Sequence, residues 1–303
     1  MNVLVLGGCG FIGSHIVDAL LKAGHDVRVL GHSPEKFRES VSSVDYFVAD
    51  FSDNAVLKKA MDGIDVVFHS LSATVPATSN RDPEQDIRDN LINTVRLLDI
   101  MKKASVKRMV FLSSGGTVYG NPETIPIPEN HPLNPLCSYG IIKATIEKYL
   151  FMHQQLYGLQ PVIIRPSNPY GPRQGHTGIQ GVISTFMAKI MQGEPAQVWG
   201  TGDVVRDFFH VEDLARLCVM AAESDSVGIF NAGSGSGCSI RELIEIISNV
   251  SGASPNIEYR EGRQFDVREV VLDIQKAEST FGWKPEISLH DGIRDYWEWM
   301  TNL

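Results

Sequence analysis

A glycine-rich motif, Gly7-x-x-Gly10-x-x-Gly13, follows the first apolar segment of this 303-residue chain. Glycines at this spacing permit a tight turn, a close approach of the backbone to a pyrophosphate, and packing of the next helix against the first strand. The helix that begins near Phe11 then directs its free N–H groups and its positive end at the phosphates. The motif therefore predicts a strand, a turn and a helix that together bind a dinucleotide.

Short β-rich segments alternate with helical patterns over the first half of the chain. Strands are expected at 3–6, 27–30, 46–48, 66–69, 109–112 and 162–164, and helices at 12–23, 55–61, 84–104 and 139–157. Apolar strands that alternate with helices indicate a parallel sheet buried between two helical layers. The sequence predicts an α/β protein with a Rossmann-type, doubly wound parallel sheet.

The regular alternation ends after Arg165, where prolines and a glycine interrupt the chain. Further helices are expected at about 182–192, 212–223 and 240–251. We expect a dinucleotide-binding domain at residues 1–166 and a smaller C-terminal α/β substrate-binding domain at residues 167–303. The segment at about 207–223 is expected to return to the first domain.

Composition and charge exclude several classes of function. The net charge of −9 opposes binding to nucleic acid or to an acidic membrane surface, and an anionic substrate would need a local concentration of basic side chains. The four cysteines have neither paired metal-ligand spacing nor a disulfide framework, so no metal site is expected. The chain begins with an apolar strand, without a leader pattern, and has no apolar run near ~20 residues, which indicates a cytoplasmic protein.

Tyr139 and Lys143 are four residues apart in an expected helix and therefore share one face. A tyrosine phenol has a pKa near 10. Its use as a base near neutral pH requires that this pKa be lowered by ~3, and each neighbouring positive charge lowers it by about 1–3. Lys143 and an oxidised nicotinamide ring can supply that shift. Tyrosine and lysine at this spacing also occur on ordinary surface helices, but downstream of a dinucleotide motif they predict proton transfer coupled to redox chemistry.

Six separate motifs are spread along the chain. They are Gly7-Gly8-Cys9-Gly10-Phe11-Ile12-Gly13-Ser14-His15, Ser113-Ser114-Gly115-Gly116-Thr117-Val118-Tyr119-Gly120, Tyr139-Gly140-Ile141-Ile142-Lys143, Arg165-Pro166-Ser167-Asn168-Pro169-Tyr170-Gly171-Pro172-Arg173, Arg206-Asp207-Phe208-Phe209-His210-Val211-Glu212-Asp213 and Phe281-Gly282-Trp283-Lys284-Pro285. With these motifs in this order, the chain resembles the extended short-chain dehydrogenase/reductase family over essentially its whole length, and particularly its NAD-dependent nucleotide-sugar epimerases and dehydratases.

The resemblance implies that Tyr139 is the general base and that Lys143 binds the nicotinamide ribose and tunes Tyr139. It also implies a Ser or Thr that hydrogen-bonds the reacting hydroxyl, but this residue would fall at Gly115. Ser114 or Thr117 must serve instead, and we favour Ser114.

The loop between Ser114 and Val118 reads Gly-Gly-Thr and contains no acid. By resemblance a dehydratase carries an acid in this loop, so its absence favours epimerisation over elimination of water. We expect an NAD-dependent sugar-nucleotide 4-epimerase that acts on a UDP-hexose or a UDP-N-acetylhexosamine through a 4-keto intermediate. The alternatives are an NADP-dependent nucleotide-sugar reductase, another isomerase, and a non-catalytic cofactor-binding protein.

The choice between NAD and NADP depends on the end of the second strand. The carboxylate that usually binds the adenosine ribose is missing, because Gly31, His32 and Ser33 follow Leu30. Gly31 with His32 and Lys36 could accommodate a 2′-phosphate, or this segment could be an ordinary solvated turn. NAD is favoured because an epimerase returns its hydride in each cycle and needs no reducing pool.

The remaining candidate residues are assigned by motif and by resemblance. For the cofactor they are Gly7, Gly10, Phe11, Ile12, Gly13, His32, Asp50, Phe51, Leu71, Asn90 and Lys143. For the substrate they are Asn168, Trp199, Arg206 and Arg263, with Arg173 and Arg268 as further members of a basic patch or as solvated surface residues. The resemblance also implies a homodimer formed by the apolar sides of helices 84–104 and 139–157, although burial within one chain explains the same pattern.

Overall fold

The structure is a computed structural model that describes residues 1–35, 38–175, 181–253, 255–262 and 267–302. The helices are α1 (Phe11–Lys22), α2 (Asn54–Ala60), α3 (Pro76–Ser79), α4 (Pro83–Asp86), the π-helical η1 (Ile87–Ile92), α5 (Asn93–Lys103), α6 (Ser138–Tyr157), α7 (Val182–Gln192), α8 (Val211–Glu223), α9 (Ile240–Ser251), α10 (Gln275–Phe281) and α11 (Leu289–Thr301). The strands are β1 (Asn2–Leu6), β2 (Asp26–Gly31), β3 (Asp45–Val48), β4 (Val66–His69), β5 (Arg108–Leu112), β6 (Gln160–Pro166), β7 (Asn168–Tyr170), β8 (Ala196–Trp199), β9 (Val205–Arg206), β10 (Phe208–His210), β11 (Gly228–Ala232), β12 (Cys238–Ser239), β13 (Ile257–Arg260) and β14 (Glu269–Val270).

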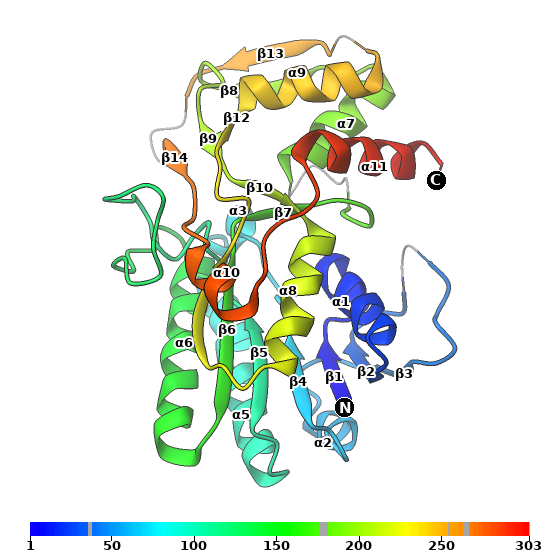
Figure 1. Cartoon of the computed structure of the whole chain (residues 1–303), viewed down its shortest axis with the longest axis vertical. Coiled ribbons are helices and arrows are strands. Elements are labelled where there is room, and N and C mark those ends of the chain that lie inside the picture. Colours follow the sequence, from blue (N-terminus) through cyan, green and yellow to red (C-terminus); the bar gives the residue numbers. More distant parts are fainter. Residues whose placement is uncertain (36–37, 176–180, 254, 263–266, 303) are drawn as a thin grey trace.

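A seven-stranded sheet in the order β11-β6-β5-β4-β1-β2-β3 forms the larger part of the molecule (Figure 1). Every neighbouring pair in this sheet is parallel. The strand order reverses between β1 and β4, and ligands bind at such a switch point, outside the carboxyl ends of the strands. The predicted doubly wound α/β class is confirmed.

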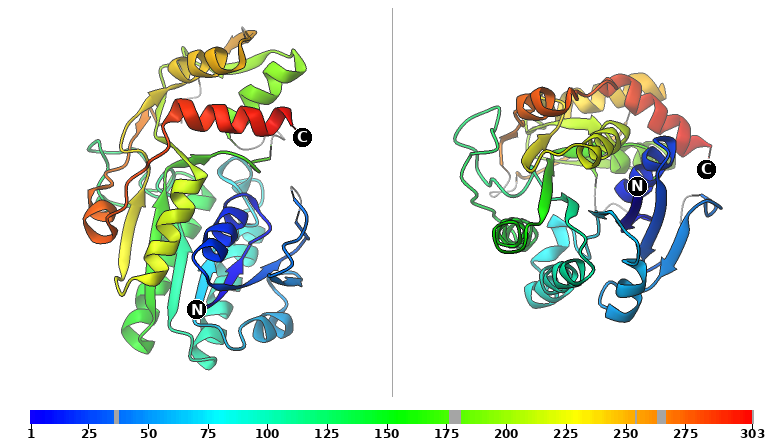
Figure 2. Two further views of the ribbon diagram at one scale, coloured as in Figure 1. Left: turned by 45° about the vertical axis from the view of Figure 1, so that its right-hand side comes forward. Right: turned by 60° about the horizontal axis from the view of Figure 1, so that its bottom comes forward.

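Helices cover both faces of the sheet, as the view along the strands in Figure 2 shows. Helices α1 and α8 pack side by side on one face, over a core that includes Ile16, Leu214 and Trp283. Helices α2, α5 and α6 cover the other face. The inner strands β1, β4 and β5 therefore have no solvated face, which explains why their sequences are mostly apolar, whereas the edge strand β3 is partly exposed.

The second half of the chain builds a smaller α/β unit beyond the carboxyl ends of the strands (Figure 1). Its apolar core joins α7, α9 and α11 to the parallel pair of β8 and β13. Two short sheets, β7 with β10 and β12-β9-β14, connect this unit to the larger sheet. The smaller unit therefore covers the N-terminal end of α1, where both line one cavity.

Two of the differences from the sequence-based expectations concern the larger sheet and the helices that cover it. The segment expected as one helix at 84–104 is divided into α4, η1 and α5, where Asn93 and Thr94 bind the carbonyl oxygens of Asp89 and Asn90 with their side chains. Such bonds compete with regular helical pairing. The seventh strand, β11, was not expected, because its buried Asn231 interrupts the apolar pattern.

A buried ion pair fixes α6 to the sheet. Arg165 on β6 donates to both carboxylate oxygens of Glu147 on α6, at 2.9 and 2.5 Å, and each side chain is 1% exposed. Ser113, just after β5, also donates to Glu147, and the Tyr119 hydroxyl accepts from Arg165 at 2.9 Å. The network joins α6, β6 and the loop after β5 in one arrangement.

We predict that Glu147→Gln lowers the free energy of unfolding by about 3–5 kcal/mol, because Arg165 would remain as an uncompensated buried charge. Urea unfolding measures this change. As a control, Arg260→Gln breaks the exposed pair with Glu258 and is expected to change stability by less than about 0.5 kcal/mol. An equally small change in Glu147→Gln would contradict the prediction.

Candidate active site

The glycine motif forms the turn between β1 and α1. Gly7 has φ +82°, a conformation that strains other residues, and its carbonyl oxygen accepts from the Gly10 N–H at 3.0 Å. A Cβ on Gly13 would lie 2.1 Å from the Gly7 oxygen, so no side chain fits there. The backbone at the start of α1 therefore lies against the end of β1, with its free N–H groups at the carboxyl edge of the sheet.

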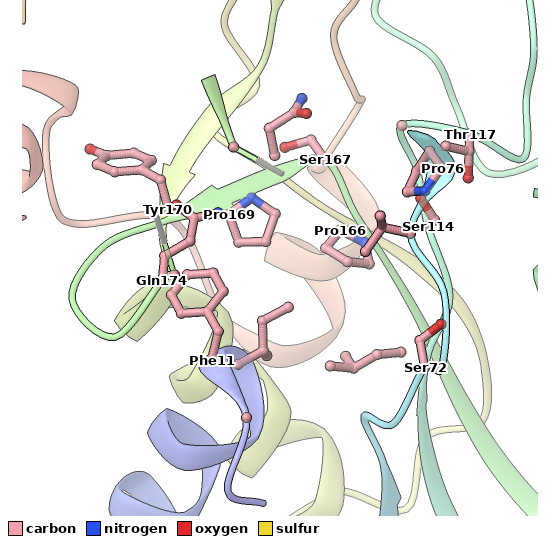
Figure 3. Close-up of a pocket in the computed structure, with 18 of the residues that line it drawn as sticks. Phe11, Ser72, Pro76, Ser114, Thr117, Pro166, Ser167, Pro169, Tyr170 and Gln174 are labelled. Carbon is pink, nitrogen blue, oxygen red and sulfur yellow. The ribbon is translucent and has the colours of Figure 1, made fainter. Parts of the chain in front are cut away.

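A cavity of about 880 Å³ lies along this edge, between the sheet and the smaller unit. It is large enough for a cofactor and part of a substrate. Figure 3 shows Phe11 of α1 on one side and Ser114 and Thr117 on the other. The predicted site residues that line it are Gly7, Gly10, Phe11, Ile12, Gly13, His32, Leu71, Ser114, Thr117, Tyr139, Lys143, Asn168, Arg173, Trp199 and Arg206.

The cavity wall is basic although the whole chain is acidic. Lys143, Arg173 and Arg206 line it together with His32, and its described lining contains no Asp or Glu. In a chain of net charge −9 this segregation favours anionic ligands. The local concentration of basic side chains that an anionic substrate requires is therefore present.

Tyr139 and Lys143 both face the cavity from the first turns of α6. The Lys143 Nζ donates to the carbonyl oxygen of Leu112, at the end of β5, at 2.8 Å. It lies 5.5 Å from the centroid of the Tyr139 ring and 4.9 Å from that of Phe111. The lysine is thus held by the sheet, with its charge beside the tyrosine.

Burial shifts the pKa values of this pair in opposite directions. It lowers the pKa of Lys143 to about 8, against the opposing effects of the Glu147 and Asp86 carboxylates. It raises the pKa of the Tyr139 phenol, and Cys137 and Asp86 add to that rise. In this structure the tyrosine is therefore protonated near neutral pH, and its use as a base requires a further positive charge in the cavity.

The two hydroxyl groups proposed to replace a serine at position 115 both line the cavity. The Thr117 Oγ1 is buried without a hydrogen-bond partner. The Ser114 carbonyl oxygen accepts from the Val118 N–H at 3.1 Å, which fixes the backbone that carries the Ser114 hydroxyl. Gly115 is glycine for a steric reason: a Cβ there would lie 2.5 Å from the Leu272 Cδ1 and 2.9 Å from the Arg165 oxygen.

Three predicted cofactor residues do not belong to the cavity lining. Asp50 is exposed and accepts from the Ser52 N–H at 2.8 Å, and Phe51 is buried against His69. Asn90 accepts from the Ala73 N–H at 2.9 Å and donates to Asp86 at 2.8 Å, so it shapes the loop after β4. Their roles at a cofactor remain predictions.

Two predicted residues, Arg263 and Lys36, lie outside the described residues. Arg268 is described and exposed, and it is not among the residues that line the cavity.

The end of β2 presents no carboxylate to the cavity. Gly31, His32 and Ser33 line that part of the wall. The next acid, Glu35, accepts from Arg38 at 3.1 Å and from the Tyr46 hydroxyl at 3.0 Å. Glu35 is therefore engaged by its own loop and by β3.

The hydroxyl-rich loop after β4 and a glutamine after β7 also border the cavity, and their residues Ser72, Thr74 and Gln174 were not predicted from the sequence. Ser72 and Thr74 line the cavity, as does Gln174, whose Oε1 is buried without a partner. The position of β4 at the switch point could have indicated the loop, since ligand-binding residues follow such strands. Nothing in the sequence around Gln174 distinguishes it from a surface glutamine.

The model of the NAD dependent epimerase/dehydratase family matches residues 3–233. The chain belongs to this family. A relative from Methanocaldococcus jannaschii, described as a putative UDP-glucose 4-epimerase, is 39% identical over 99% of this chain and 98% of its own length.

Solved structures of the family superpose over nearly the whole chain. A Thermotoga maritima UDP-glucose 4-epimerase with UDP-glucose has a TM-score of 0.95 at 33% identity, covering 100% of this chain and 99% of its own. The Thermus thermophilus UDP-glucose 4-epimerase in complex with NAD has a TM-score of 0.93 at 33% identity, covering 99% of each chain. The predicted family, fold, enzyme class and NAD cofactor are confirmed. Within the described residues, none of the helices has the length and apolar character needed to cross a membrane.

We predict that Gly115→Ser destabilises the protein by about 1–3 kcal/mol, because a Cβ there would overlap the Leu272 side chain and the Arg165 carbonyl oxygen. Thermal unfolding measures the effect. Gly116→Ser is the matched control, since a Cβ there would meet nothing nearer than the Ser167 oxygen at 3.7 Å. Equal stability of the two variants would show that the loop adapts to a side chain at 115.

Proposed function

We propose that this protein is a sugar-nucleotide 4-epimerase that acts on a UDP-hexose or a UDP-N-acetylhexosamine. The observation that carries the proposal is the Tyr139 and Lys143 pair in a basic cavity beside the glycine turn. A base and a dinucleotide site in one cavity permit oxidation of an alcohol, and the cations suit a diphosphate. The match to UDP-glucose 4-epimerases over nearly the whole chain supports this substrate class.

The residues present fit a dinucleotide. The Gly7 and Gly13 contact leaves the N–H groups at the start of α1 open to phosphates, and Phe11 and Ile12 line the cavity beside them. Lys143 would hold the nicotinamide ribose. Bound NAD supplies the hydride acceptor and one positive charge.

Tyr139 accepts the proton of the substrate 4-hydroxyl. Burial alone opposes its ionisation, so the deprotonated phenol depends on the ammonium of Lys143 and on the positive charge of the oxidised cofactor. Lys143 can meet this demand because its own pKa, at about 8, leaves it largely protonated near pH 7. When the keto sugar is reduced, Tyr139 would return the proton to the oxygen at carbon 4.

The hydroxyls of Ser114 and Thr117 hold the oxygen at carbon 4. The unpartnered Oγ1 of Thr117 makes it at least as well placed as Ser114, which the sequence alone favoured. The absence of an acid from the described lining of the cavity favours epimerisation over elimination of water, which needs a proton donor for the leaving hydroxyl.

Binding energy is placed away from the reacting carbon. Arg206 lines the cavity from the smaller unit and would bind the diphosphate, with Asn168 and Trp199 nearby in the wall. Firm attachment of the nucleotide allows the keto sugar to turn between the two half-reactions. Arg263 is proposed to share this task.

An NADP-dependent reductase is the second candidate. It is favoured by the end of β2, where Gly31 and His32 line the cavity without a carboxylate that would reject a 2′-phosphate. In such an enzyme the same Tyr139 would donate its proton to a keto sugar. Stoichiometric consumption of NADPH with a nucleotide-keto-sugar would distinguish this reaction from epimerisation.

We predict that the protein interconverts the 4-epimers of one or more UDP-sugars without added cofactor, and that Tyr139→Phe lowers turnover by at least ~10², because the ring remains while the transferable proton is lost. Chromatography of a panel of UDP-, dTDP-, GDP- and CDP-sugars measures the reaction. Retained NADH binding in Tyr139→Phe serves as the folding control. Near-normal epimerisation by this variant, or no reaction with any UDP-sugar, would contradict the proposal.

We also propose that the protein is a homodimer. One stripe of α6 exposes Ile141, Met152 and Leu156, and Ile87 and Ile92 are exposed on the neighbouring η1. Apolar side chains gathered on adjacent helices are typical of a contact surface. The stripe also lies on the helix that carries Tyr139.

We predict that light scattering gives about twice the chain mass of 33.4 kDa, and that Leu156→Glu shifts the protein towards the monomer, because a charge would be buried in the contact. Tyr259→Glu is the control, since Tyr259 is equally exposed, at 60% against 62%, on β13 of the smaller unit. A wild-type mass of one chain would exclude the dimer.

A further inference from the structure

A turn that follows β7 crosses α1 close to the glycine motif. The Pro172 carbonyl oxygen accepts from the Nε2 of His15, on α1, at 2.9 Å. The next residue, Arg173, has φ +67°, an unusual conformation for a residue other than glycine. Figure 3 shows the neighbouring Gln174 beside Phe11, the first residue of α1. The turn thus joins the substrate side of the cavity to the helix that faces the cofactor phosphates.

Arg173 is fixed by two side chains of α1. Its Nη2 donates to the Nδ1 of His15 at 3.0 Å and to the Oδ2 of Asp18 at 2.7 Å. An arginine can only donate, so the His15 Nδ1 is the acceptor and its Nε2 carries the proton. Burial and the charge of Arg173 lower the pKa of His15 to about 4, which keeps this neutral form near pH 7.

Asp18 also pairs with a second arginine, from a different loop. Arg38, in the loop after β2, donates to the Oδ1 of Asp18 while Arg173 occupies the Oδ2. The loop after β2 flanks the adenosine end of the predicted cofactor site. The turn after β7 is bonded to α1, whose N-terminus faces the predicted pyrophosphate. One carboxylate on α1 therefore joins two segments that border the same ligand.

One nitrogen of Arg173 has no partner. The Nη1 is buried without a hydrogen bond, although Arg173 lines the cavity that also contains Gly10 and Phe11. A buried guanidinium donor is costly to leave unpaired. An anionic oxygen at the start of α1 would satisfy it.

We propose that Arg173 donates through its Nη1 to a phosphate oxygen of the dinucleotide, and that Arg173, His15 and Asp18 form a clamp that retains the cofactor. This inference rests on the NAD site used in the proposed function. The substrate diphosphate is the other anion in the cavity, but Arg173 is anchored on α1, whose N-terminal N–H groups face the cofactor. The sequence placed Arg173 either in a basic substrate patch or at the solvated surface, and this proposal assigns it to the cofactor instead.

The clamp suits an enzyme that recycles its cofactor. A hydride that is taken and returned in each cycle requires that the nicotinamide stay bound through many turnovers. The arginine reaches the phosphates from the substrate side, so the cofactor would leave only after the bonds of Arg173 to His15 and Asp18, or the bond to phosphate, had opened. Cofactor release should therefore be slow, and it should depend on Arg173 more than substrate binding does.

We predict that Arg173→Met increases the Kd and the dissociation rate of NADH by at least about tenfold, as expected for loss of a charge-assisted hydrogen bond. The change in NADH fluorescence on displacement by excess NAD measures the rate. Binding of UDP, measured by calorimetry on the NAD-loaded protein, should change less than about twofold. Asp18→Asn, at a side chain that is 40% exposed, should give a smaller increase in the same direction.

Arg216→Met is the matched control. Arg216 is also partly buried and paired with a carboxylate, Asp213, at 2.6 Å, but it lies outside the cavity lining. It should leave NADH dissociation unchanged. Unchanged NADH binding in Arg173→Met with weakened UDP binding would assign Arg173 to the substrate, and no change in either would show a structural ion pair only. If the wild-type protein retains NADH but epimerises no sugar, the proposed function fails while the clamp is still tested.

Discussion

The contact between Gly7 and Gly13 is the constraint on which the remainder of the site depends. A single Cβ at position 13 would overlap the Gly7 carbonyl, so α1 reaches the carboxyl edge of the sheet only because both residues are glycine. That contact places the N–H groups of α1 in the cavity. It also fixes the position of α1 and so of its residues His15 and Asp18, which accept hydrogen bonds from Arg173 in the turn after β7.

A second buried arrangement positions the chemistry. Glu147 lies two helical turns beyond Tyr139 on α6 and is paired with Arg165 of β6, while Lys143 binds the end of β5. The face of α6 that carries the base is therefore fixed at two points along the sheet. The same packing removes water from Tyr139 and Lys143, which raises the pKa of one and lowers that of the other. Rigid placement and pKa tuning have one physical origin, the burial of α6.

Local patterns predicted the parts of the protein that depend on local physics. The strands β1 to β6, α1, α6 and the glycine turn follow from apolar periodicity and from the steric freedom of glycine, and their predicted positions agree with the structure. The strand β11 was missed because its buried Asn231 is satisfied by the distant Tyr119, Ile127 and Asp273. From the sequence alone a polar residue is predicted to be solvent-exposed. It can lie in the core only where the fold supplies hydrogen-bond partners for it.

The sequence by itself determined the fold class, the dinucleotide turn and the pairing of Tyr139 with Lys143, because each depends on residues that are close in the chain. Tertiary structure decided which of the other predicted site residues lie together in the cavity. It brought Arg173 to α1, kept Asp50 and Asn90 out of the cavity lining, and left Thr117 without a partner beside Ser114. The reason is that hydrogen-bond satisfaction and burial are properties of neighbours in space, and those neighbours are separated along the chain by loops whose paths no local pattern specifies.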